Sequence, residues 1–218
     1  ISREGALVLN NLFLTTATAT VFVGTLYPLL LEATTGTKIS VGAPFFNLTF
    51  GPLMIPLMIA VPFGPLLAWK RGDLMGATQR LYAAIGISIL VGLVVMAFTT
   101  DEPVLAAAGM ALGVFVILGA LTDLVHRSGI GRLPAATAWS RFKGLPRSAF
   151  GTAFAHAGLG ITMIGVVAAS VYSTEHVSAM SDGDTVDAGG YTVRFDGLKD
   201  VQGPNYTAKS GEFTVSKG

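Results

Sequence analysis

The chain has 218 residues, of which 51% are hydrophobic and only 12% are charged, whereas soluble domains carry roughly 25% charged residues. Its mean hydropathy of +0.63 indicates a membrane protein, and its net charge of +1, with basic residues in short loops, gives no reason to expect a nucleic-acid partner. The sequence contains no cysteine, which excludes disulfides, thiolate metal sites and thiol catalysis.

Five apolar stretches approach the roughly 20 residues that a helix needs to cross a bilayer. They lie at about residues 6–31, 45–69, 81–98, 103–125 and 149–172. Prolines interrupt the second stretch, so we expect either one kinked span or a broken span with an interfacial part. We therefore predict an all-α polytopic membrane domain over residues 1–174.

Residues 175–218 differ in composition from the helical part, with several aspartates beside turn signals such as Gly189-Gly190. Tyr191, Val193 and Phe195 alternate with polar residues, which predicts a half-buried strand, and residues 212–215 suggest another. Two or three strands alone would be marginal in stability. We expect this segment to be the truncated start of a C-terminal extracytoplasmic β domain, and the chain to be a piece of a longer protein.

The charged loops predict the orientation of the helices. Lys70, Arg71 and Arg80 lie between the second and third stretches, and a second basic loop runs from Arg127 to Arg147. The positive-inside rule assigns both basic loops to the cytoplasm. The N-terminus of the chain is then also cytoplasmic, and the C-terminal tail lies on the opposite side of the membrane.

His156 lies inside the last apolar stretch, among the small residues Ala155, Ala157, Gly158 and Gly160. An ionisable side chain inside a membrane is a functional-site hypothesis, and histidine is a common ligand of metals and of haem iron. Two other interpretations stay open. The ring could pack between helices and bond a neighbouring hydroxyl or carbonyl, or it could relay protons.

The sequence resembles the C-terminal half of the CcmF-type haem lyase subunits (the CcmF/NrfE/CcsA-like cytochrome c maturation family). The motifs that carry the resemblance are SREGALVLNN (2–11), GTLYPL (24–29), KISVGAPFFN (38–47), GPLLAWKRGD (64–73), FAHAGLG (154–160) and VQGPNYTA (201–208). These motifs occur in order along the whole chain, which makes the resemblance far more specific than any single motif would.

The resemblance implies a haem lyase (cytochrome c synthase) subunit of the bacterial inner membrane, with a periplasmic tail. Such a subunit takes haem from a periplasmic haem chaperone and helps to attach it to the CxxCH cysteines of apocytochrome c. It also implies that His156 is an axial ligand to the iron of a membrane haem b. The implied partners further include the other maturation subunits, membrane lipid and a quinol.

The chain departs from the family pattern in lacking the WWD segment and the other expected histidines. The resemblance places them in an N-terminal half that is either missing here or carried on a separate chain. His176 lies 20 residues from His156, about 30 Å along a helix, and His126 lies in a loop, so neither is a good second ligand. The catalytic residues remain unknown. A transporter or proton-relay protein, or a non-catalytic scaffold of the maturation complex, stays open as an alternative.

Two smaller features have structural interpretations. Gly109-xxx-Gly113 predicts a close contact between helices. Topology and anionic lipid explain the basic residues of the loops, with pairing to haem propionates left open. These residues are Lys70, Arg71, Arg141, Lys143 and Arg147.

Overall fold

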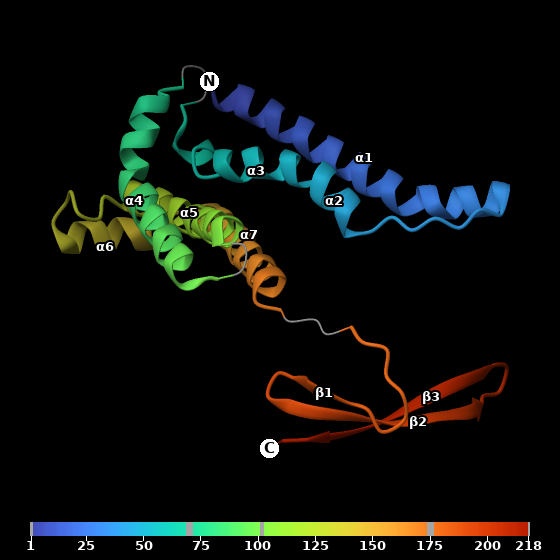
Figure 1. Ribbon diagram of the computed structural model, residues 1–218. Helices are drawn as coiled ribbons and strands as arrows, with labels where there is room; N and C mark the ends of the chain where they lie inside the picture. The colour runs from blue at the N-terminus through green and yellow to red at the C-terminus, as the bar shows by residue number, and fades with distance from the viewer. Residues whose placement is uncertain (1, 69–71, 101–102, 174–176, 218) are drawn as a thin grey trace. The chain divides into compact units, whose positions relative to one another are not determined.

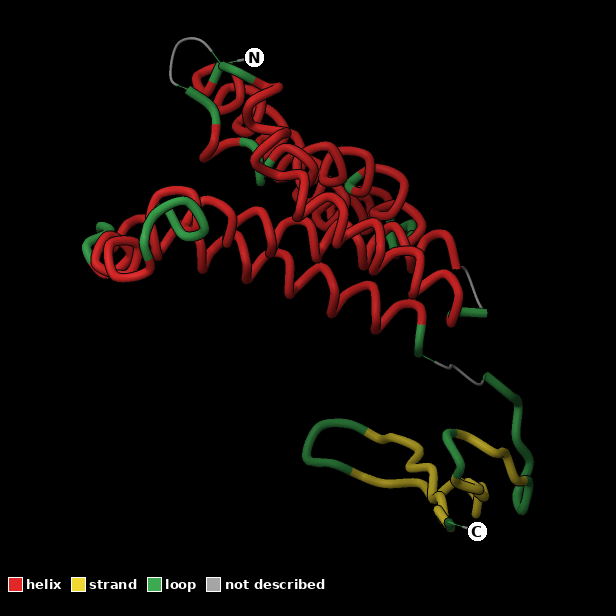
Figure 2. The backbone as a smooth tube through the Cα atoms, turned by 90° about the vertical axis from the view of Figure 1, so that its left-hand side faces the viewer, coloured by secondary structure: helices red, strands yellow, loops and turns green. Residues whose placement is uncertain are grey.

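The computed structural model describes residues 2–68, 72–100, 103–173 and 177–217. The chain divides into two units, Ile1–Val171 and Tyr172–Gly218. The first unit is helical, and the strands are confined to the second (Figures 1 and 2). Each unit is described by itself.

The helical unit is built mainly from long apolar helices. Four helices are long and apolar enough to cross a membrane, and a bent pair makes a fifth if it counts as one span. The fold class predicted from the sequence is therefore confirmed. The helices are α1 (Arg3–Thr35), α2 (Ala43–Thr49), α3 (Gly51–Ala60), the 3-10 helix η1 (Gly64–Leu66), α4 (Leu74–Phe98), α5 (Pro103–Ser128), α6 (Ala135–Lys143) and α7 (Arg147–Val171).

The second apolar stretch is broken, as its prolines suggested. It forms α2, α3 and η1, and the chain bends by 45° between α2 and the segment that follows. Pro56 lies inside α3, where its ring removes a backbone donor. After α3 ends, Pro62 is fully buried, and a Cβ placed on Gly119 of α5 would collide with its ring. This contact packs the end of α3 closely against α5.

Helix α5 packs against both α4 and α7. Glycines bring α5 and α7 close together, because a Cβ added to Gly160 would lie 2.6 Å from the carbonyl oxygen of Gly113 and 2.7 Å from Cγ1 of Ile117. A Cβ on Gly109 would likewise lie 2.5 Å from Cγ2 of Val167. The contact predicted from Gly109-xxx-Gly113 is thus confirmed.

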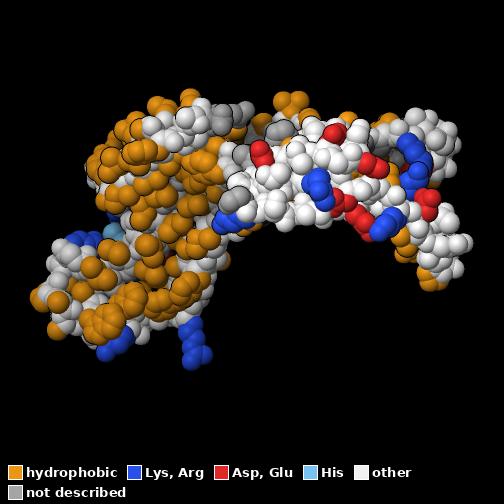
Figure 3. Space-filling view, turned by 60° about the horizontal axis from the view of Figure 1, so that its bottom comes forward, with side chains coloured by type: hydrophobic (Ala, Val, Ile, Leu, Met, Phe, Trp, Pro, Cys, Tyr) orange, Lys and Arg blue, Asp and Glu red, His pale blue; other side chains and the backbone are white. Residues whose placement is uncertain are grey.

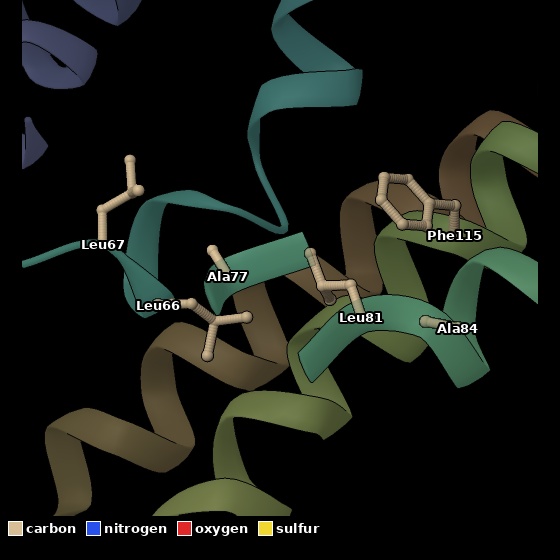
Figure 4. Packing of buried hydrophobic residues seen from close by; sticks show 6 residues of the cluster. All are labelled: Leu66, Leu67, Ala77, Leu81, Ala84 and Phe115. Atoms are coloured by element: carbon tan, nitrogen blue, oxygen red, sulfur yellow. The ribbon is translucent and has the colours of Figure 1, made fainter. Parts of the chain in front are cut away.

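The core of the helical unit joins η1 to α4 and α5. Its buried residues are Leu66, Leu67, Ala77, Leu81, Ala84 and Phe115 (Figure 4). The face of this unit seen in Figure 3 is largely apolar. Large apolar side chains are exposed on several helices, among them Val8, Phe22 and Leu30 of α1. Such a surface matches a helical unit surrounded by lipid or by further helices.

The second unit is an antiparallel sheet with the strand order β1-β2-β3. Its strands are β1 (Thr185–Ala188), β2 (Tyr191–Gln202) and β3 (Thr207–Ser216), so both predicted strands are confirmed. Gly189 and Gly190 form the two-residue turn between β1 and β2 with φ of 60° and 82°. Both angles are positive, as a tight hairpin turn requires.

Candidate functional site

His156 lies in the first half of α7 and is half-buried. Thr152 precedes it by one helical turn and therefore shares its face of the helix. Gly160, one turn further on, packs against α5. The close α5–α7 contact thus fixes the position of the helix that carries His156.

The His156 side chain lines a cavity of about 400 Å³. Helices α1, α3 and α7 and the segment around η1 form its walls, so it joins residues far apart in the sequence. Most of the wall is apolar, which is typical of sites for small molecules and cofactors. The lining residues are Arg3, Ala6, Leu7, Leu9, Asn10, Phe13, Leu57, Ala60, Val61, Phe63, Gly64, Pro65, Leu67, Leu74, Thr152 and His156.

The imidazole of His156 makes no hydrogen bond with any residue in the described ranges 2–68, 72–100, 103–173 and 177–217. The next hydroxyl along α7, that of Thr162, donates to the carbonyl of Gly158 at 3.0 Å. Within the described residues, His156 is therefore not a packing histidine that bonds a neighbouring hydroxyl or carbonyl. The ring remains available to a ligand in the cavity.

Arg3 and Asn10 supply the other strongly polar groups on the cavity wall. They are seven residues apart, or about two turns, and so lie on one face of α1. Arg3 had no predicted role in a site, although the seven-residue spacing places it on the same helix face as Asn10. The backbone N–H of Arg3 donates to the carbonyl of Ala68 at 3.1 Å, which holds the start of α1 beside the chain that follows η1.

The donor set fits a haem better than a bare metal ion. The described residues contain no group of three or more His, Cys, Asp or Glu side chains that could hold a metal. A haem needs only an axial imidazole, apolar walls for the macrocycle and cations for its propionates. His156, the apolar wall and Arg3 offer these three elements in one cavity.

The remaining histidines do not complete this site. His126 lies in the last turn of α5 and not in a loop as predicted, because this helix continues past the apolar stretch to Ser128. It lines a different pocket, beside Arg80 and Arg132. His176, Lys70 and Arg71 lie outside the described residues. Within the described chain, the cavity therefore offers one imidazole.

An ion pair that the sequence analysis did not identify lies near the end of α5. Asp123 is 5% exposed, and both of its carboxylate oxygens accept from Nε of Arg127, at 2.8 and 2.9 Å. The sequence could have indicated this pair, because an acid four residues before a base on a helix favours an ion pair. Arg127 thus compensates the charge of a nearly buried carboxylate, which does not line the His156 cavity.

Comparison with known families connects this chain to cytochrome c biogenesis proteins. Residues 171–218 match the family described as the CcmF C-terminal beta-sandwich. The chain is 63% identical to the cytochrome c-type biogenesis protein CycK of Rhizobium meliloti, covering 100% of this chain and 32% of that protein. It is 39% identical to CcmF of Pseudomonas aeruginosa, covering 99% of this chain and 32% of the relative.

A solved structure described as the cytochrome c heme lyase CcmF has a similar fold. It superposes with a TM-score of 0.63 at 24% sequence identity, covering 100% of this chain and 33% of that one. The chain therefore spans about a third of the length of the relatives that it matches.

Proposed function

Because this chain belongs to the CcmF-type cytochrome c biogenesis family and corresponds to its C-terminal part, we propose that it is the haem-binding portion of a membrane haem lyase. In this proposal His156 is an axial ligand to the iron of a haem b. The chain is a multi-pass membrane protein, and we assign it to the bacterial inner membrane with its C-terminal tail in the periplasm.

The observation that carries the proposal is the unpartnered imidazole of His156 on an apolar cavity wall. An ionisable ring without a partner is costly inside a membrane, and coordination to iron would remove this cost. Phe13, Leu57 and Phe63 would exclude water from the macrocycle. Arg3 lies on the same wall, where its guanidinium could pair with a propionate.

A bound haem would supply one-electron redox chemistry, and the residues of this chain would hold and shield it. The second axial ligand would come from outside the described residues. This chain covers only about a third of the length of its relatives, which leaves room for such a ligand elsewhere in the complete protein. We further propose that the complete protein attaches haem to the cysteines of apocytochrome c. It would receive the haem from a periplasmic chaperone, with a quinol as the source of electrons.

A transporter or proton relay has less support in the cavity. A relay needs a second group that can take up and release a proton near neutral pH. Among the described residues of the cavity wall, only Arg3 is ionisable besides His156, and a guanidinium does not release its proton in proteins. A passive scaffold would place no demand on His156, and substitution of this residue separates it from the haem-binding proposal.

The test is the haem content of the full-length protein, purified from haem-replete membranes and measured as the pyridine haemochrome. We expect His156→Ala to lose nearly all of its haem. The matched control is His126→Ala, which removes a histidine that lies outside the cavity and should retain the wild-type haem content. A wild-type level of haem in a folded His156→Ala protein would refute the assignment and favour the scaffold.

A further inference from the structure

A second pocket, of about 420 Å³, lies where the start of α4 meets the end of α5. Two arginines and one histidine from different segments line it: Arg80 of α4, Arg132 from the turn after α5 and His126 of α5. The remaining lining residues are Thr122, Val125, Ile130 and Gly131. Neither the cytochrome c relationship nor the His156 cavity explains why these basic groups converge.

Backbone contacts hold the two arginines in place. Nη2 of Arg132 donates to the carbonyl of His126 at 2.6 Å, and its Nη1 lies 3.4 Å from Nε2 of the same histidine. Gly129 and Gly131 adopt φ of 76° and 79°, which turns the chain back so that Arg132 reaches the end of α5. Nη1 of Arg80 donates to the carbonyl of Leu66 at 3.4 Å.

The pocket is positively charged, and no carboxylate among the described residues lines it. Asp123, the acid buried nearby on α5, is already bound through both oxygens by Nε of Arg127. Guanidinium groups use only part of their five donors in the contacts above, so further donors remain for an anion. Converging guanidinium groups are the side chains best suited to phosphate oxygens.

The surroundings of the pocket indicate a membrane interface. Both α4 and α5 are candidate spans, and the pocket lies at one end of each. Val125 and Ile130 add apolar surface beside the cations. In the following helix α6, Trp139 is 57% exposed and stacks on Phe142 with ring centroids 5.5 Å apart. Tryptophan is enriched at the level of lipid headgroups.

We propose that Arg80 and Arg132 bind the phosphate group of an anionic phospholipid, with His126 holding Arg132 in place and the lipid chains against Val125 and Ile130. Basic pockets between membrane helices recognise headgroups in this way. The same phosphate chemistry could also bind free inorganic phosphate. The apolar wall favours the lipid, because inorganic phosphate would gain nothing from Val125 and Ile130.

The test compares wild type with Arg80→Gln and Arg132→Gln, using the full-length protein in phosphatidylcholine nanodiscs. Phosphatidylglycerol or inorganic phosphate is added in separate titrations, and binding is followed by the thermal unfolding midpoint and by native mass spectrometry. The control is Arg141→Gln, which removes an exposed arginine of α6 that does not line the pocket. It measures the effect of losing a surface cation that meets anionic lipid outside the pocket. The haem content of every variant reports on folding and on the separate His156 site.

We expect phosphatidylglycerol to raise the midpoint of wild type and Arg141→Gln, with inorganic phosphate having little effect. Loss of one charge-assisted contact should weaken phosphatidylglycerol binding by about ten-fold in each pocket variant. An equal response to inorganic phosphate would overturn the lipid assignment. Unchanged affinity in Arg80→Gln and Arg132→Gln, or equal weakening in Arg141→Gln, would overturn the site itself.

Discussion

The close packing of α5 and α7 makes Gly160 a sensitive position for both stability and haem binding. In Gly160→Ala, the new methyl group would lie 2.6 Å from the carbonyl oxygen of Gly113 and 2.7 Å from Cγ1 of Ile117. One of these obstacles is backbone, so the helices must separate. Overpacking of this kind costs about 1–3 kcal/mol, against a gain of about 1 kcal/mol from replacing glycine by alanine in a helix.

The matched control is Gly165→Ala on the same helix, where no atom lies within 4 Å of the added Cβ. It should gain up to about 1 kcal/mol from helix propensity alone. A change of 1 kcal/mol shifts the unfolding midpoint of a domain of about 150–250 residues by roughly 2–4 °C. The midpoint of Gly160→Ala should therefore fall several degrees below that of Gly165→Ala in the same detergent.

Gly160→Ala should also bind haem less well, because His156 lies one turn away on α7 and moves with the helix. Thermal unfolding and haem content, measured on the same preparations, test both effects. If Gly160→Ala is as stable as Gly165→Ala, then α5 and α7 are not in the close contact on which the position of His156 depends.

Two further predictions concern the cavity and the sheet. Ala60→Trp should place a large ring in the cavity and lower the haem content. Ile55→Trp, at an exposed position on the same helix α3, should keep the wild-type haem content. Equal haem content in the two variants would contradict the cavity as the haem site. The hydroxyl of Thr214, followed by the Arg194 side chain, lowers the pKa of the exposed Asp196 carboxyl. Its small stabilising effect is therefore present above the pKa of an unfolded aspartate and lost as the pH falls through the folded value. In an NMR titration of the carboxyl, Thr214→Val should raise the midpoint, and an unchanged midpoint would exclude the hydroxyl as the main cause.

Much of the fold could be predicted from the sequence because its strongest signals are local. Long apolar runs predicted the long helices, and prolines such as Pro56 predicted the break in the second stretch. The alternation from Tyr191 to Phe195 predicted β2, and Gly189-Gly190 predicted the turn before it. Each of these features depends on residues that are close together in the chain.

Features that depend on short segments were harder to predict. Helix α6 has only nine residues, too few for the criterion of a membrane span, so the loop that contains it was read only for its charge. Strand β1 has four residues and includes Asp187, which is unusual in strands. Contacts with a neighbouring element stabilise each of them: α6 packs against α5, and β1 pairs with β2.

The candidate site shows the same limit. His156 could be singled out because a titratable residue in an apolar run is rare. The cavity that it lines could not be predicted, because it forms only where α1, α3 and α7 meet. The place of Arg3 in the cavity wall could not be predicted either. Arg3 lines the cavity because the start of α1 lies beside the segment around η1.

The most direct measurement of the haem proposal is ligand rescue in a His156→Gly variant of the full-length protein. The dithionite-reduced spectrum should lack b-type bands when the protein is purified without imidazole, and the bands should return when imidazole is added with haem. His126→Gly should show the bands under both conditions. Wild-type bands in His156→Gly without imidazole would contradict axial ligation by His156.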